Sequence, residues 1–595
     1  MPPKINYHYN QTDKDLIVSL SKKRLPNLKQ LKYLGKFLKP KEYTFLSLGA
    51  LLIIIGLFIF GYHFYSQNFE VHPASGGRYT EGSVGSPQYI NPLYASLNSV
   101  DDDIAKVVFS SLFTRDRNGY LTNDLVQTYE LSQDQKTYTF KIAKGVKWHD
   151  GNDLTTDDII FTIETIQDPA FHSPLRLQLA GVEAKKIDDL TFSLTLPESY
   201  APFIESLTFG IIPKNTWEEI SANSVPLTSL NLNPIGSGPY EFVSLSKDKS
   251  GTIRSYTLTA NQNYYRQKPF IDKIVFKFFA SQEELVAALN SGQIDGASYL
   301  TSDDLKNINA KNSYNFNRLE IPENTALFFN LRNKDAAYSD KKVRQALALA
   351  INKKDLTNKI FGENVSLINS PINNASFGYS KDVAEYNYNL TEAKRLLTEA
   401  GWQLKTTSIA SSSPETVLTK NNLPLEIKLT VADSPESIKT AEYISAAWQE
   451  MGLKVTLDIV NKNDLQSQIL KPKSFSVLLY SWLVGVDPDP YLMWHSSQAG
   501  ENGMNLSGYN NNRVDKLLEE ARLNNNPEAR KKSYAEFQKL ITGDLPAVFL
   551  YSPRYIYALN KEVKGFNYLV ITSPEDRLSG INYWYLKQSH SLKLQ

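Results

Sequence analysis

The longest apolar stretch of the chain runs from residue 43 to residue 65 and contains no charged side chain. A helix of that length spans the roughly 30 Å of hydrocarbon in a bilayer. Aromatic side chains stand at both ends, Tyr43 and Phe45 at one and Tyr62 and Phe64 at the other, where rings tend to occupy the membrane interface. The pattern therefore predicts one transmembrane helix over residues 43–65.

The charges around this stretch predict its orientation. Residues 1–42 hold ten Lys or Arg and three Asp or Glu, and no Lys or Arg follows the stretch until Arg78. The positive-inside rule then predicts a cytoplasmic arm over residues 1–42 and a large extracytoplasmic domain. We interpret the stretch as an uncleaved signal anchor, because the apolar run and the arm are long for a cleaved signal peptide. A buried core helix is the other alternative.

Behind the apolar stretch, the sequence predicts a linker and then an α/β fold. Pro73, Gly76 and Gly77 are typical of a linker, which we place at residues 66–85. Further on, short runs of period two alternate with runs of period 3.6, which favours parallel or mixed sheets covered by helices. Thr155 with Asp158 has the spacing of a helix-capping box. The predicted strands are residues 136–142, 273–280, 454–460 and 475–483, the predicted helices are 343–360, 391–400, 435–451 and 527–541, and 406–419 is a predicted polar loop.

Composition and motifs argue against an enzyme. The 595 residues include no Cys, which excludes disulfides, thiol catalysis, Fe–S clusters and Cys-bound zinc. The seven His show no HExxH spacing, and neither a GxxxxGK[ST] loop nor a GxSxG elbow occurs. We therefore expect no catalytic residue, no metal and no cofactor. Asp487 and Asp489, in an Asp-Pro-Asp-Pro run, are interpreted as a rigid turn that directs carboxylates toward a ligand.

A series of short motifs, in order along the chain, carries a family resemblance. They are NPL at 91–93, GVKWHDG at 145–151, LTTDD at 154–158, GSGPY at 236–240, NQNYY at 261–265, SGQID at 291–295, FNL at 329–331, VRQAL at 343–347 and AGW at 400–402. Each motif alone is weak, but their order and spacing are specific. Over about residues 78–570 the chain resembles the extracytoplasmic solute-binding proteins of ABC importers, in the family of oligopeptide-, dipeptide- and nickel-binding proteins (family 5).

The resemblance implies a two-lobed periplasmic-binding-protein-like fold of type II, in its large three-subdomain variety, behind the N-terminal helix. Lobe 1 would cover residues 86–330, with a subdomain inserted at about 113–235. Lobe 2 would cover 331–545, and residues 546–595 would return to lobe 1. Two crossings between the lobes would lie near residues 327–331 and 547–551. A ligand would bind in the cleft, and hinge closure would bury it.

The resemblance also implies which residues contact the ligand from lobe 1. Leu97, Asn98 and Ser99 correspond to an edge that pairs with a peptide backbone in peptide-binding relatives. The acidic run from Asp101 to Asp103 is instead expected to cap the helix that follows, because carboxylates at a helix N-terminus accept its free amide bonds.

The opposite edge, in lobe 2, corresponds to Trp482, Leu483 and Val484, with Trp482 as a wall of the pocket. In many peptide-binding relatives an Asp three residues after this Trp binds the peptide ammonium, but this chain has Gly485 there. Asp487 is the candidate substitute. Capping its own proline turn is an equally weighted alternative role for Asp487.

The function that the resemblance implies is capture of peptides and their delivery to an ABC transporter permease, at the cell membrane and by a monomer. Tethering would keep the receptor near its permease and raise the effective concentration. Nucleic acid is not an expected partner. Three alternatives stay open: a non-peptide ligand such as a metal chelate or glycoside, a sensor or peptide-holding chaperone without transport, and an anchored peptidase.

Overall fold

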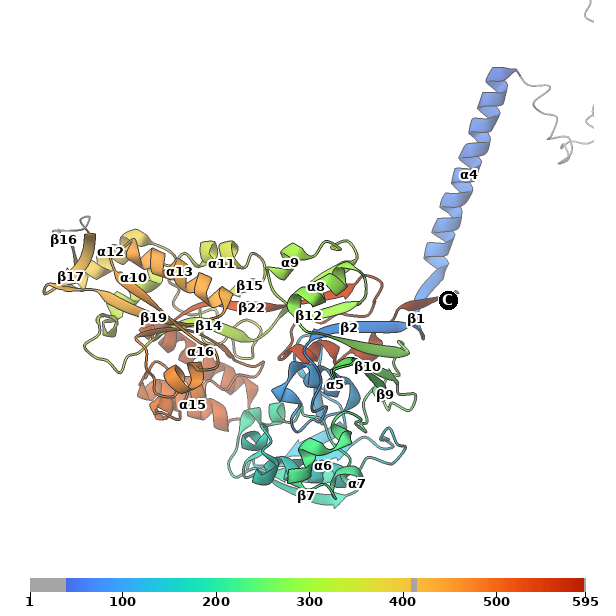
Figure 1. Cartoon of the computed structure of the whole chain (residues 1–595), viewed down its shortest axis with the longest axis horizontal. Coiled ribbons are helices and arrows are strands. Elements are labelled where there is room, and N and C mark those ends of the chain that lie inside the picture. Colours follow the sequence, from blue (N-terminus) through green and yellow to red (C-terminus); the bar gives the residue numbers. More distant parts are fainter. Residues whose placement is uncertain (1–38, 408–414, 593–595) are drawn as a thin grey trace, which may run out of the picture. The chain divides into compact units, whose positions relative to one another are not determined.

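The computed structural model describes residues 39–407 and 415–592 (Figure 1). The predicted cytoplasmic arm lies almost entirely outside the described residues. The chain divides into two compact units, residues 1–73 with 588–595, and residues 74–587. The second unit contains both predicted lobes.

The apolar stretch forms helix α4 (Pro40–Asn68), which begins and ends three residues beyond the predicted bounds. Within it, Pro40–Phe64 is long and apolar enough to cross a membrane, and none of its most apolar window is buried. The first unit also holds a two-stranded sheet of β1 (Phe69–Ala74) and β23 (Lys587–Leu592). The linker prediction for residues 66–85 is wrong, since 66–68 end α4, 69–74 form β1 and 78–84 form the buried strand β2. Gly76 and Gly77 make the turn into β2 with positive φ angles, which favour glycine.

One mixed sheet runs through the second unit. Its strands are hydrogen-bonded in the order β20, β19, β21, β14, β22, β12, β2, β11, β10 and β9, and both β13 and β15 pair with β22. The strands β11 and β12 lie parallel to β2, and β20 and β21 lie parallel to β19, whereas the other pairs are antiparallel. The bounds are β2 (Arg78–Val84), β9 (Tyr240–Lys247), β10 (Ile253–Ala260), β11 (Lys273–Phe279), β12 (Gly296–Leu300), β13 (Tyr314–Glu320), β14 (Glu323–Phe329), β15 (Val365–Leu367), β19 (Glu426–Ala432), β20 (Lys454–Val460), β21 (Val477–Leu483) and β22 (Ala547–Asn560).

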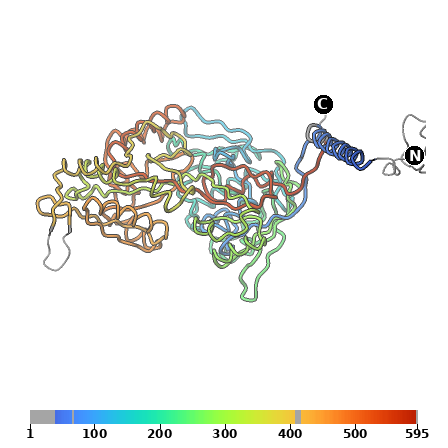
Figure 2. Tube along the Cα trace, turned by 90° about the horizontal axis from the view of Figure 1, so that it is seen from above, coloured from blue at the N-terminus to red at the C-terminus, as the bar shows by residue number. Residues whose placement is uncertain are grey.

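The long strand β22 belongs to both halves of this sheet, and Figure 2 shows the red C-terminal segment running along both. Its first part pairs with β14 and β15, up to Pro553. Its second part pairs with β12 and β13, from Arg554 opposite Glu320. We use lobe 1 for residues 74–320 and 554–587, and lobe 2 for residues 323–553. The crossings therefore lie at residues 321–322 and 553–554, a few residues away from the predicted ones.

Helices cover both faces of the lobe 2 sheet (Figure 1). Successive side chains of β14 point to opposite faces. Leu327 and Phe329 pack in the core beneath α10, α12 and α13, while Ala326 and Phe328 pack in the core beneath α15 and α16. The helices are α10 (Lys341–Leu349), α11 (Lys353–Ile360), α12 (Leu390–Glu399), α13 (Pro435–Gln449), α15 (Asn512–Leu523) and α16 (Pro527–Asp544).

Several predicted elements are confirmed and others need correction. The capping box of Thr155 and Asp158 opens helix α6 (Thr156–Gln167). A separate sheet lies beside it, in the order β5 (Val126–Leu131), β6 (Thr137–Ile142), β8 (Thr191–Thr195) and β7 (Glu183–Asp188). The predicted helix 343–360 is instead two helices, because Asn352 accepts the amide of Asp355 and so starts α11. The predicted polar loop 406–419 is a hairpin of β16 (Gln403–Thr407) and β17 (Glu415–Lys420), with 408–414 outside the described residues.

A buried ion-pair network fastens the C-terminal return of the chain to lobe 1. Arg577, in the short helix η10 (Pro574–Leu578), donates to both oxygens of Asp103 at 2.6 and 2.7 Å and to Glu81 at 2.7 Å. Its side chain and that of Glu81 are 0% exposed. Glu81 also accepts the hydroxyls of Tyr79 and Tyr557. A buried guanidinium needs such partners, because the cost of desolvating it is large.

We expect Arg577→Met to lower the free energy of unfolding by about 3–5 kcal/mol, because two buried carboxylates lose their counterion. Chemical denaturation followed by tryptophan fluorescence measures it, since Trp584 packs edge-on against Tyr79. The control is Arg254→Met, which breaks an ion pair with Asp248 that is partly exposed to solvent and should cost under about 1 kcal/mol. Equal losses in the two variants would contradict the assignment.

Candidate functional site

Strand β21 has a paired side and a free side. All seven of its residues face β14, from Val477 opposite Phe329 to Leu483 opposite Glu323. On its other side, β19 pairs only with Val477 and Leu478. No described strand pairs with residues 479–483 there, and we call this side the free edge of β21. Unpaired amides and carbonyls on such an edge can accept another strand.

The hydrogen-bond register shows which residues face outward. The amide of Val484 donates to the carbonyl of Pro322 at 2.6 Å, on the β14 side. Backbone groups of successive strand residues point to alternate sides. The amide and carbonyl of Leu483, and those of Ser481, therefore point away from β14. The Leu483 side chain is also exposed, at 61% of its surface.

Trp482 and Gly485 flank the outward-facing residue Leu483. The Trp482 ring packs edge-on against Phe328, 5.3 Å between centroids, so it forms part of a rigid apolar wall. Gly485 ends the strand with a φ of +83°, in the left-handed region, and its carbonyl accepts the Ser376 hydroxyl. These contacts fix the backbone just beyond the free edge.

The predicted lobe 1 edge is a helix start. Leu97 is exposed, and Asn98 caps α5 (Ser99–Val108) by accepting the amide of Val100. The expectation that the acidic run caps this helix is therefore wrong. Asp101 accepts the amides of Gln88 and Tyr89 instead, and Asp103 binds Arg577 as described above. No hydrogen bond between described residues joins positions 97–99 to positions 482–484.

Asp487 is held inside lobe 2 by a two-point ion pair. Arg530 of α16 donates to its two carboxylate oxygens at 2.7 and 2.5 Å. The Arg530 side chain is 6% exposed and lies over the ring of Phe377. Asp487 therefore already has a cationic partner. Its predicted part in binding a ligand ammonium stays a prediction.

Asp489 takes part in a contact between the lobes. It binds Arg522 of α15 at 3.0 Å and accepts the hydroxyl of Tyr200, from the lobe 1 insertion, at 3.1 Å. The Arg522 guanidinium lies 5.1 Å from the centre of the Tyr200 ring. Nearby, Asn525 donates to Gln135 at 2.9 Å. The two lobes thus touch through polar contacts.

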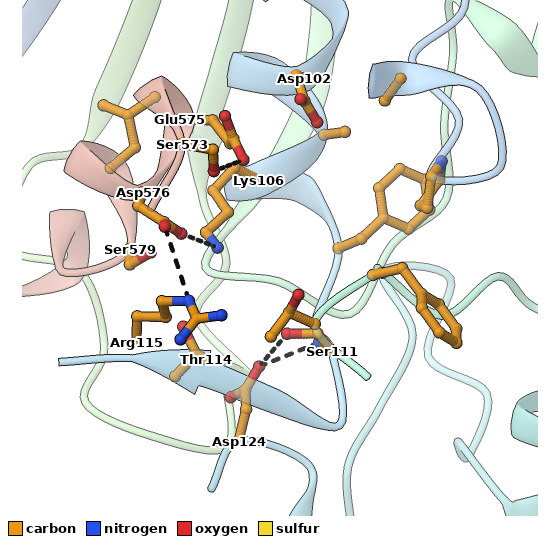
Figure 3. A pocket seen from close by; sticks show the side chains of 18 of the residues that line it. Asp102, Lys106, Ser111, Thr114, Arg115, Asp124, Ser573, Glu575, Asp576 and Ser579 are labelled. Atoms are coloured by element: carbon orange, nitrogen blue, oxygen red, sulfur yellow. Dashed lines mark hydrogen bonds and ion pairs between the residues drawn. The ribbon is translucent and has the colours of Figure 1, made fainter. Parts of the chain in front are cut away.

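A cavity of about 290 Å³ lies in lobe 1, between α5, η10 and the insertion (Figure 3). Its lining begins next to the predicted edge, since Ser96 belongs to it. Three bases in the lining are each paired. Lys106 binds Asp576 at 2.8 Å, Arg115 binds Glu205 at 2.5 Å, and Arg266 binds Asp124 at 3.1 Å. We call it the lobe 1 cavity.

Two further carboxylates of the lining, Asp102 and Glu575, form no ion pair among the described residues, although the charge of the nearby Lys106 acts to lower the pKa of both. Burial raises the pKa of Glu575, and the neighbouring Asp102 and Asp576 raise it further. Burial also raises the pKa of Asp102, together with repulsion from Asp103. Asp576 behaves differently. Burial alone would raise the pKa of its carboxyl, but Lys106 and Arg115 lower that pKa below its usual value.

Sequence reasoning missed Arg530, Glu205 and Glu575. Arg530 and Glu205 form ion pairs with Asp487 and Arg115, which lie far from them in the sequence. Glu575 is likewise far in the sequence from Asp102, which faces the same cavity. The one local signal of the lobe 1 cavity was the acidic run at residues 101–103. Within it, Asp102 is the residue that accepts no hydrogen bond from a described residue.

Comparisons with known proteins agree on one family. Residues 121–504 match the model of bacterial extracellular solute-binding proteins, family 5, middle region. The oligopeptide-binding protein AppA of Bacillus subtilis is 28% identical over 535 residues, which cover 86% of this chain and 92% of that protein. Its structure in complex with a nonapeptide has a TM-score of 0.65 at 25% identity and covers 87% of this chain and 100% of that chain.

Two further solved structures show the same fold. The ABC transporter substrate-binding protein CtaP of Listeria monocytogenes has a TM-score of 0.72 at 26% identity, over 86% of this chain and 99% of that chain. NikZ from Campylobacter jejuni, in complex with Ni(L-His), has a TM-score of 0.66 at 25% identity, over 85% of this chain and 99% of that chain. The predicted α/β fold of the periplasmic-binding-protein type is confirmed.

We expect Asp487→Asn to lower the free energy of unfolding by about 3–5 kcal/mol, because the buried Arg530 guanidinium loses its counterion. Adding Arg530→Met should recover most of that loss, since no unpaired charge remains. Chemical denaturation measures both. The matched control is Asp382→Asn, which removes a surface partner of Lys539 and should change stability by under about 1 kcal/mol. Unchanged stability in Asp487→Asn would instead favour a ligand-binding role for this carboxylate.

Proposed function

Because the chain belongs to family 5 of the bacterial extracellular solute-binding proteins, as its motifs indicated, we propose that it captures peptides between its lobes and delivers them to an ABC transporter permease. The observation that carries the proposal is the free edge of β21, with Leu483 directing an amide and a carbonyl outward. An extended peptide can add to such an edge as a further strand.

Backbone pairing suits a receptor for peptides of many sequences. Main-chain hydrogen bonds are common to every peptide, so they supply affinity without reading side chains. Leu483 and Ser481 offer alternate bonding positions along the strand, and Trp482 between them offers an apolar wall. In lobe 1, the exposed Leu97 with Asn98 and Ser99 stays our candidate for the facing edge. A relative whose ligand is known supports the proposal, because the structure of AppA contains a bound nonapeptide.

Closure of the cleft would use the two crossings at residues 321–322 and 553–554. Hinges are commonly a few residues at the ends of elements. The polar contacts of Asp489 and Asn525 with the lobe 1 insertion would then hold the closed state. Such contacts are partly solvated and individually worth under about 1 kcal/mol, which lets the lobes reopen at the permease.

A non-peptide ligand is the second candidate, and one observation favours it. Gly485 stands where many peptide-binding relatives have the Asp that binds the ammonium, and Asp487 is already paired with Arg530. A relative of the same fold, NikZ, was solved with Ni(L-His). A ligand without a free N-terminus would need no carboxylate at this place.

We also propose that α4 anchors the receptor to the cell membrane, with residues 1–42 in the cytoplasm. The length and apolar composition of Pro40–Phe64 support the anchor, and the basic arm supports the orientation.

The first test is native mass spectrometry of the full chain, purified in detergent, followed by denaturation and identification of what is released. We expect a set of short peptides of mixed sequence, because backbone pairing tolerates side chains. Protein that has been unfolded, washed and refolded is the control and should release nothing. A single defined non-peptide mass would overturn the peptide proposal and favour the second candidate.

The second test uses the absence of Cys, which removes any background for thiol labelling. We expect Lys249→Cys, in the exposed turn between β9 and β10, to react with a membrane-impermeant maleimide in intact cells. Ser19→Cys, in the arm, should react only after the cells are permeabilised. Recovery of the labelled protein in the medium would contradict the membrane anchor. Labelling of both sites in intact cells would contradict the cytoplasmic position of the arm.

A further inference from the structure

Acidic side chains outnumber basic ones in the lining of the lobe 1 cavity. Five acidic and three basic side chains line it, which leaves a formal charge of −2. The three bases are bound to Asp576, Glu205 and Asp124. Asp102 and Glu575 are therefore the two lining carboxylates without an ion pair, and they face the same space from α5 and η10 (Figure 3).

We propose that this cavity is a subsite for a positively charged organic group of the bound ligand, an ammonium or guanidinium, held between Asp102 and Glu575. The inference rests on the proposed function, since the group belongs to a captured peptide. Such a subsite would give the protein a preference for positively charged ligands, which the backbone groups on the free edge of β21 do not supply.

The state of the two carboxylates supports a cationic guest. Glu575 accepts a hydrogen bond only from the Ser573 hydroxyl among the described residues, and Asp102 accepts none. Both have raised pKa values, because burial and neighbouring acids penalise their charge by more than the nearby Lys106 relieves it. A cation between them removes that penalty, since an opposite charge within about 4–6 Å favours the ionised form. The Ser579 hydroxyl, buried in the same lining without a hydrogen-bond partner, is a further free polar group.

Size and chemistry favour an organic cation over a metal ion. At about 290 Å³ the cavity has room for roughly ten waters, taking about 30 Å³ for each. That is enough for the end of a long basic side chain with its hydration. Within residues 39–407 and 415–592, no group of three His, Asp or Glu side chains is placed to hold a metal ion.

The cavity is also within reach of the interlobe cleft. Ser96 of its lining directly precedes Leu97 of the predicted lobe 1 edge. On its other wall, the charges of Asp487 and Arg530 in lobe 2 act on the pKa of Glu205, which burial raises and Arg115 lowers. A peptide on the free edge of β21 could therefore place one basic group in this cavity.

The test is calorimetric titration of the ligand-stripped full chain in detergent with penta-alanine peptides. Each position in turn carries Lys or its neutral analogue norleucine, and each peptide is made with a free or an acetylated N-terminus. For wild type we expect one of the two comparisons to show an affinity difference of about tenfold or more. Either Lys binds more tightly than norleucine at one position, or the free N-terminus binds more tightly than the acetylated one. The first result identifies a side chain as the source of the cation, and the second identifies the α-ammonium.

Asp102→Asn and Glu575→Gln should each reduce that preference to about twofold or less and leave the affinity for the neutral peptide within twofold. Glu219→Gln, an exposed carboxylate elsewhere in lobe 1, is the charge-matched control and should keep the full preference. A preference that survives both variants, or is absent from wild type, overturns the subsite. So does an equal loss for charged and neutral peptides. If no peptide of either kind binds, the proposed function fails and the subsite fails with it.

Discussion

The burial of one guanidinium, that of Arg577, is the constraint on which the two-lobed arrangement depends. It sits between a strand near the start of the second unit, a helix that follows it and a segment from the end of the chain. Glu81 of β2 and Asp103 of α5 can be desolvated only because Arg577 returns to them. The site is packed so closely that a side chain at Gly296 would place its Cβ 2.2 Å from a Glu81 oxygen. The chain must therefore leave lobe 1, build lobe 2 and come back.

That return explains why a strand edge is available at the centre of the molecule. The lobes share β22 and are joined next to it by the step from β13 to β14, so the sheet stays continuous from one lobe to the other. β21 extends along β14 into this region, but β19 stops pairing after Leu478. The amide and carbonyl of Leu483 are left unpaired by geometry that the sheet order imposes. This unpaired edge is the surface that we propose binds a peptide.

Local interactions were predictable from the sequence, and distant ones were not. The capping box of Thr155 and the period-two strand at 454–460 depend on neighbours within a few residues, so the residue pattern contains them. The break at Asn352 escaped prediction because the apolar pattern continues across it and only a side-chain cap reveals the second helix. Arg530, the partner of Asp487, lies on a segment that only the fold brings to it. The order of the motifs indicated the family, because the motifs are spread over residues 91–402 and so cover much of the fold.

Gly485, just beyond the free edge of β21, leaves room for a side chain. Its left-handed backbone favours glycine, yet a Cβ added there would meet nothing closer than the Asp487 carbonyl oxygen at 3.7 Å. Space is therefore no obstacle, and the cost of a side chain is the conformational one, about 1–2 kcal/mol, which Asp and Asn tolerate best. That cost corresponds to about a tenfold change in an equilibrium constant. The chain is therefore one inexpensive substitution away from a carboxylate at this position, and that change would not require the fold to be rebuilt.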